Sequence, residues 1–240
     1  MIRFVYLLLP LLLGLSTPEK INYDVRYILG DLNTRVITVE ITWEESEWNE
    51  IPAYHSEAVL KTRPFFRLFL SPYYYAETYF NQDERKPLFF ANPFKYKGKK
   101  ATYEYVYREQ EIESKSDLGS GPAIYTSFPN DNQTVDFLSL VFFIRFLDLE
   151  AAREPLPLHI LISGKSFPAE LQYLGQDPDK YPDTPADKFL LRMTERGLME
   201  NGSGHEVYIW RSISDNPVIL GLETELSAGF MSVKMTNFAE

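Results

Sequence analysis

Residues 21–43 read INYDVRYILGDLNTRVITVEITW and carry the pattern of a β-hairpin. The first part, residues 21–27, alternates between apolar and polar side chains, and the turn residues Gly30-Asp31-Leu32-Asn33 follow it. After the turn the apolar side chains again fall on one face of an extended chain, namely Ile37, Val39, Ile41 and Trp43. Because successive side chains of a strand point to opposite faces, this pattern predicts two neighbouring strands with one apolar face.

Similar alternating segments recur along most of the chain, the last of them at residues 230–237. Residues 113–133 are rich in Ser, Gly, Asp, Asn and Pro, which predicts a loop. One helix is expected near residues 134–152, where the apolar side chains are so dense that the helix should be buried. The expected fold is mainly β (α+β), a curved antiparallel sheet or partly closed barrel of about nine or ten strands with one buried helix.

The N-terminus has the composition of a secretory signal peptide. The basic residue Arg3 precedes an apolar run over residues 4–13, and the small residues Gly14 and Ser16 follow. The run spans about ten residues, whereas a transmembrane helix needs roughly 20. We therefore expect residues 1–16 to be a signal peptide and residues 17–240 to be a single, exported, β-rich domain with no transmembrane span after cleavage.

Charge and cysteine content exclude several classes of function. The chain has a formal net charge of −10, and an acidic surface repels phosphate backbones, so no nucleic-acid partner is expected. The sequence contains no cysteine, which excludes a disulfide framework and cysteine-based catalysis. Stability must therefore come from a hydrophobic core, which a chain of this length can build.

Four short motifs follow one another along the chain, at residues 23–30, 135–145, 160–175 and 207–217. The second contains Asp136, Ser139 and Arg145 in an Asp-x-Leu-Ser…Arg pattern, and the third contains Gly164. In order and spacing the chain resembles the exported bacterial family known as domain of unknown function 3108. A second early glycine of that family is missing here from residues 33–35, so the first turn is expected to differ in shape.

The resemblance implies a location and a shape but no activity. It implies a protein of the periplasm of a Gram-negative bacterium. It also implies a β-rich half-barrel similar to lipoprotein-carrier proteins.

Motifs for catalysis and for metal binding are absent from the sequence. No Gly-x-Ser-x-Gly pentapeptide occurs, and the three histidines, His55, His159 and His205, are scattered along the chain. Their spacing does not match a zinc site. The acidic loop 177–187 has oxygen ligands that suit calcium, but its prolines and its lack of an EF-hand pattern favour a solvated loop instead. We therefore expect no catalytic residues, no metal and no cofactor, with calcium at the loop left open.

Aromatic side chains are concentrated between residues 65 and 80. Inward-facing rings of this kind are ordinary core residues of a β-sheet, whereas exposed rings line apolar clefts or stack on sugars. Three consecutive tyrosines at 73–75 must place at least one ring on the opposite face from the others. The candidate ligand-binding residues are Phe66, Phe69, Tyr73, Tyr74, Tyr75 and Tyr79.

Two classes of function fit these observations best. The first is a non-catalytic binding or carrier module for an apolar or lipidic ligand, with a lipid or a glycan as its ligand. The second is a structural or interaction protein that binds another protein of the cell envelope, and a hydrolase is the third alternative. A cavity between the sheet and the helix would favour the carrier, whereas a solid core with a flat apolar surface patch would favour the interaction protein. Polar residues converging on a histidine would favour the hydrolase.

Overall fold

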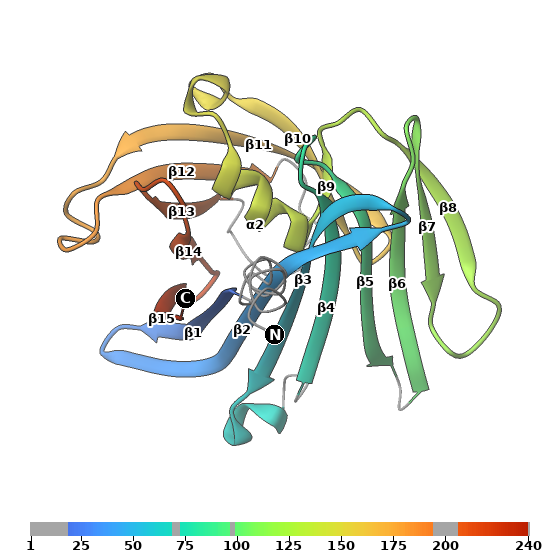
Figure 1. Ribbon diagram of the computed structural model, residues 1–240. Helices are drawn as coiled ribbons and strands as arrows, with labels where there is room; N and C mark the ends of the chain where they lie inside the picture. Colours follow the sequence, from blue (N-terminus) through green and yellow to red (C-terminus); the bar gives the residue numbers. More distant parts are fainter. Residues whose placement is uncertain (1–18, 69–72, 97–98, 194–205, 240) are drawn as a thin grey trace, which may run out of the picture.

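The computed structural model describes residues 19–68, 73–96, 99–193 and 206–239, so the expected signal peptide lies outside the described residues. The described strands belong to one 15-stranded sheet, which curls around a single α-helix into a nearly closed barrel (Figure 1). The first eight strands are β1 (Glu19–Leu29), β2 (Leu32–Trp48), β3 (Ile51–Thr62), β4 (Tyr73–Asn81), β5 (Pro87–Tyr96), β6 (Lys99–Tyr107), β7 (Glu111–Asp117) and β8 (Ile124–Pro129). The others are β9 (Thr134–Asp136), β10 (Leu156–Ile162), β11 (Lys165–Gln176), β12 (Ala186–Met193), β13 (Glu206–Ser212), β14 (Ile219–Glu225) and β15 (Phe230–Ala239).

Strand order follows the chain except at one junction. Strands β1 to β8 form one meander and β10 to β15 form another, and the antiparallel pair of β1 and β15 joins the two. The sheet ends at β8 on one side and at β9 on the other, where β9 pairs with β10 in parallel. The first and last strands of the chain therefore lie side by side in the middle of the sheet.

The hairpin predicted at residues 21–43 is confirmed. Strands β1 and β2 are antiparallel, with Ile21 opposite Ile41 and Tyr23 opposite Val39. Gly30 lies in the turn with φ of 55°, a left-handed conformation that a glycine adopts without strain. The apolar face of the hairpin points into the barrel and belongs to its core.

The predicted number of strands was wrong, because the described residues alone form 15 strands instead of nine or ten. Part of the difference is the expected loop at 113–133, most of which forms β7 and β8. In β7 the buried positions are Ile112 and Ser114. Serine supplies no apolar alternation, so this strand has no pattern that distinguishes it from a loop.

The helix is shorter than the expected 134–152. The structure has α2 at Phe137–Phe146, preceded by β9 and followed by a 3₁₀ helix, η2, at Leu149–Ala152. Asp136 caps the N-terminus of α2, and the extended residue Leu147 ends it. The expected burial is confirmed, since Leu138, Leu140, Phe142 and Ile144 are among its buried side chains.

Helix α2 contributes to two hydrophobic clusters inside the barrel. Leu138 belongs to a cluster that contains Phe90 and Tyr105 of the first meander and also Leu161 and Trp210 of the second. Leu140 and Ile144 pack with core residues of β9 to β14. The helix therefore supplies part of the core of both clusters, and the first of them joins the two meanders. No helix within the described ranges has the length and apolar character that crossing a bilayer requires.

Candidate functional site

A hollow of about 450 Å³ lies between α2 and the ends of several strands, and we call it the α2 hollow. Its apolar lining comprises Ile51, Pro87, Leu88, Tyr107, Val135 and Phe143. Its polar lining comprises Asn81, Glu84, Arg85, Lys86, Arg108, Glu109, Asn130, Asn132 and Thr134. Phe143 comes from α2 and Val135 from β9, whereas the polar residues come mainly from the β4–β5 turn, the β6–β7 turn and the segment before β9. An apolar wall therefore faces a rim of charged and amide side chains.

Side-chain hydrogen bonds fix the two turns that form this rim. The Asn81 Oδ1 accepts from the backbone N–H groups of Asp83 and Glu84, at 2.9 and 2.7 Å. Asn130 donates its Nδ2 to the carbonyl of Arg108, at 2.6 Å. Such side-chain-to-backbone bonds replace ladder bonds in turns and hold their shape.

Two residues of the rim have left-handed backbones. Arg85 has φ of 55° and Asn132 has φ of 63°, and conformations of this kind in non-glycine residues cluster at functional sites. The backbone of the rim therefore includes two conformations that are unfavourable for non-glycine residues, and the surrounding structure maintains them.

The charged lining of the hollow leaves one arginine without a carboxylate among its described contacts. Lys86 pairs with Glu84 at 3.4 Å, and Arg108 pairs with Glu113 at 3.3 Å. Arg85 instead donates to the carbonyl of Phe146 at 3.1 Å and lies over its ring. Its guanidinium is therefore the group of the lining that favours an anionic partner.

A fully buried polar network lies beneath the hollow. The Asp136 Oδ2 accepts from the hydroxyls of Ser139, at 2.6 Å, and of Tyr107, at 3.1 Å. Its Oδ1 accepts from the backbone N–H groups of Leu138 and Ser139. Burial raises the pKa of Asp136 to about 6, and it raises the pKa of Tyr107 well above its usual value. All four contacts stabilise the start of α2, so the network anchors the helix.

The C-terminal half of α2 is held by two buried arginines. Arg145 forms a salt bridge with Glu19 at 2.9 Å, donates to Asn216 and stacks on Trp43, with 4.2 Å to the ring. Arg211 donates to the carbonyls of Ile144 and Leu147. Arginine near the end of a helix satisfies carbonyls that have no partner within the helix.

The family-like motifs thus converge on α2. Asp136, Ser139 and Arg145 belong to the second motif and Arg211 to the fourth. Gly164, from the third, donates its N–H to the Tyr105 hydroxyl at 2.9 Å and has φ of 75°. Their observed contacts position the helix and the core around it.

The candidate aromatic residues are divided between the two faces of β4. Tyr74 points inward, where its hydroxyl donates to the Asn92 Oδ1 at 2.9 Å. Tyr73, Tyr75 and Tyr79 are on the outward face, which matches the expected split of the tyrosine triplet. Phe66 lies in the 3₁₀ helix η1 (Pro64–Leu68), whereas Phe69 lies outside the described residues. The described members therefore do not form one groove.

Outward-facing side chains of β3 and β4 form a second cluster, His55, Glu57, Tyr75 and Glu77, which we call the outer-face cluster. The Tyr75 hydroxyl donates to Glu57 at 2.7 Å and to Glu77 at 3.2 Å. The Nε2 of His55 is 3.5 Å from the Glu77 Oε2, and the ring stacks on Tyr79. The interaction with Glu77 raises the pKa of His55, and the pKa of Glu77 is lowered in turn.

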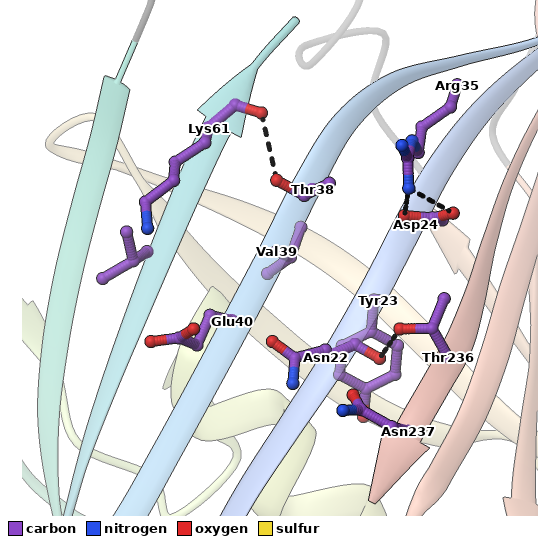
Figure 2. A pocket seen from close by; sticks show the side chains of 11 residues that line it. Asn22, Tyr23, Asp24, Arg35, Thr38, Val39, Glu40, Lys61, Thr236 and Asn237 are labelled. Atoms are coloured by element: carbon purple, nitrogen blue, oxygen red, sulfur yellow. Dashed lines mark hydrogen bonds and ion pairs between the residues drawn. The ribbon is translucent and has the colours of Figure 1, made fainter.

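A second hollow, of about 470 Å³, lies on the outer face of β1 and β2 (Figure 2). Its polar groups already bind one another. Arg35 donates to Asp24 at 3.1 Å, Thr38 to the carbonyl of Lys61, and Thr236 to the carbonyl of Asn22. This hollow has no apolar wall comparable to that of the α2 hollow.

The remaining predicted positions have structural partners. Asp177, in the acidic loop, accepts from the Trp210 indole at 3.0 Å and lies 3.6 Å from Lys188. His159 bonds Ser166 on the neighbouring strand β11, at 3.3 Å. It lies on β10, which is not adjacent to the strand of His55, and His205 is outside the described residues.

The sequence analysis did not identify the lining of the α2 hollow. Arg85, Arg108 and Asn132 lie in three separate turns, and no spacing along the chain relates them. The only available signal was the turn chemistry of Asn81 and Asn130, which marks the two turns but not their proximity in space.

The architecture places the chain in the class of β-barrel-like proteins. It is similar to the crystal structure of a β-barrel-like protein of the domain of unknown function DUF1849 from Brucella abortus, with a TM-score of 0.55 and 10% sequence identity. That match covers 92% of this chain and 97% of the other, and at this identity it shows the fold alone.

More particularly, the chain belongs to the family described as protein of unknown function (DUF3108), whose profile matches residues 22–236. The resemblance drawn from the four motifs is thereby confirmed. Comparison with curated proteins gives no match.

Proposed function

We propose that this protein is a periplasmic, non-catalytic binding or carrier module, and that the α2 hollow holds its ligand. The observation that carries the proposal is a hollow of about 450 Å³ between the helix and the sheet. Ligand sites are concave, with a mainly apolar wall and a few oriented polar groups, and they fall in this range of volume. The location of the hollow is the one that the sequence analysis associated with a carrier.

The lining suggests an amphipathic ligand with an anionic head. Leu88, Val135 and Phe143 offer an apolar wall to a hydrocarbon portion. Arg85 offers a guanidinium at the rim, and its planar fork suits carboxylate or phosphate oxygens. A lipid with an anionic headgroup has both properties.

A non-catalytic role is supported by the positions of Asp136 and of the described histidines. Asp136 is 0% exposed and its oxygens are occupied by four donors, so a ligand in the hollow has no access to it. The described histidines, His55 and His159, do not line the hollow. A general acid or base has to lie within hydrogen-bonding reach of the reacting group.

The experiment is native mass spectrometry of the mature chain purified from the periplasm, followed by organic extraction. We expect a co-purifying lipid at one molecule per chain. Titration with lysophosphatidylglycerol should then show tighter binding than with the zwitterionic lysophosphatidylcholine.

Variants connect this binding to the hollow. Arg85→Ala should weaken lysophosphatidylglycerol binding about tenfold, which corresponds to the loss of one charge-assisted hydrogen bond. Arg63→Ala, at an exposed arginine that does not line the hollow, is the matched control and should leave binding unchanged. Equal binding by both variants would reject the α2 hollow as the site.

The second candidate function is an interaction protein of the envelope. Strand β8 is a free edge of the sheet and exposes Ile124 and Tyr125, at 57% and 73% of their surface. An exposed strand edge with apolar side chains can pair with a strand of another protein. This candidate would be favoured if the protein purified without a bound lipid and if residues of β8 cross-linked to another protein in intact cells.

A further inference from the structure

The outer-face cluster combines two carboxylates and an imidazole in one small area of the sheet. Strands β3 and β4 pair so that Glu57 lies directly opposite Glu77, and His55 lies opposite Tyr79. Like charges directly opposite one another destabilise a sheet. Two facing glutamates therefore favour a cation between them.

Ligand atoms of the cluster are close enough to share one ion. One atom each of His55, Glu57 and Glu77 lies within 4.8 Å of the other two. The His55 Nε2 is buried and makes no hydrogen bond, although Glu77 is only 3.5 Å away. This nitrogen points at the carboxylates, so a metal ion that binds here would replace its ion pair with Glu77.

The surroundings of His55 orient its ring. The Nδ1 faces Glu44, with 3.8 Å to the Oε1, and the ring stacks on Tyr79 with centroids 4.5 Å apart. Trp48 packs against Tyr79 at 4.7 Å and encloses that side. A carboxylate at the second ring nitrogen is the usual partner of a metal-binding histidine, because it fixes the tautomer and the ring orientation.

We propose that His55, Glu57 and Glu77 bind a divalent transition-metal ion such as Zn²⁺ on the outer face of the barrel. Histidine nitrogen and carboxylate oxygen are both ligands of zinc, and three protein ligands leave a fourth position for water or for the Tyr75 hydroxyl. Calcium and magnesium prefer sites made only of oxygen atoms, so the imidazole favours the transition metals.

Spacing along the chain did not reveal this site, because its ligands come from two paired strands. The site is separate from the α2 hollow, with no lining residue in common. The ligand-binding proposal and the metal proposal can therefore fail independently.

The test is calorimetric titration of the mature chain with zinc chloride in a non-chelating buffer. We expect one zinc ion per chain and the release of a proton when zinc displaces it from the imidazole of His55. His55→Ala and Glu77→Gln should each weaken zinc binding at least tenfold. Glu113→Gln, at an exposed glutamate outside the cluster, should have no effect.

A spectroscopic readout makes the test independent of heat changes and of folding. Co²⁺ added to the mature chain should give visible absorption bands typical of a site with nitrogen and oxygen ligands, and zinc should displace it. Glu77→Gln is nearly isosteric, so its fold can be verified by circular dichroism before titration. Absence of zinc binding to the mature chain, or an affinity for zinc in His55→Ala and Glu77→Gln equal to that of the wild type, would overturn the proposal.

Discussion

At the scale of single residues, polar side chains inside the barrel are there to position α2. Asp136 is buried at the start of the helix, and its four donors are Tyr107, Leu138 and Ser139, the last through both its hydroxyl and its backbone. Burial of a carboxylate is unfavourable, and the hydrogen bonds that it accepts offset part of this cost. The effect of burial on the pKa of Asp136 is larger than the opposing effect of the hydrogen bonds, so the pKa is raised to about 6.

The raised pKa predicts a specific pH dependence of stability. Since the folded pKa exceeds the unfolded one, the folded state binds more protons between pH 4 and 6, and this group destabilises the fold as pH rises through that window. The free energy of unfolding of the wild type, relative to Asp136→Asn, should fall by about 2 kcal/mol from pH 4 to pH 7. Asparagine keeps the cap and has no charge.

Urea denaturation of both proteins at several pH values measures this difference. Parallel curves for the two proteins would show that the burial of Asp136 does not govern its ionisation.

At the scale of elements, the helix depends on residues from distant strands. Arg211 on β13 donates to the carbonyls of Ile144 and Leu147 and also pairs with Asp187 on β12, at 2.9 Å. One guanidinium therefore ties the end of α2 to two strands. The side chains of Arg211 and Asp187 are nearly completely buried, whereas many other ion pairs of the sheet are exposed to solvent.

Arg211→Ala should reduce the free energy of unfolding by about 3–5 kcal/mol, because it leaves the buried Asp187 without its cation. The matched control is Arg192→Ala, whose exposed salt bridges with Glu206 and Glu170 are worth about 0–1 kcal/mol. Chemical denaturation measures both values. Similar small losses in the two variants would contradict the anchoring role of Arg211.

Elements also show how far the sequence could predict this fold. Strands with apolar alternation, such as β1 with Ile21, Tyr23 and Val25, were recognised because the period of two is visible along the chain. Strand β7 was missed because Ser114 occupies a buried position without apolar character. The end of α2 was missed because apolar residues continue past it.

Sites were harder to predict than strands. The outer-face cluster depends on the register that brings Glu57 opposite Glu77, and the register is set by the pairing of whole strands. The α2 hollow depends on three turns that meet only after the sheet has curled. Neither the strand register nor the proximity of the three turns can be read from a single sequence.

At the scale of the whole molecule, the pairing of β1 with β15 joins the two meanders into one continuous sheet. Val25 lies opposite Val233 and also opposite Ile37, so β1 has a partner on each side. Strand β15 likewise pairs with β14. The last strand is therefore a structural link between the two meanders.

A chain that ends at Ala228 should lose the barrel, because β1 and β14 would become exposed edges and the two meanders would no longer be joined. We expect a non-cooperative thermal transition and aggregation, compared with one cooperative transition for a chain that ends at Ala239. Scanning calorimetry and light scattering measure these properties. A cooperative transition in the shorter chain would show that each meander is stable without the junction.

The junction has a further consequence for the order in which the structure can be acquired. Tyr23 donates its hydroxyl to the carbonyl of Ile219, a contact that spans 196 positions of the chain. Contacts of such long range raise the contact order and slow folding, since a large loop has to close before they form. A ribosome releases the N-terminal strand first, so β1 waits with one edge unpaired until nearly the whole polypeptide has emerged.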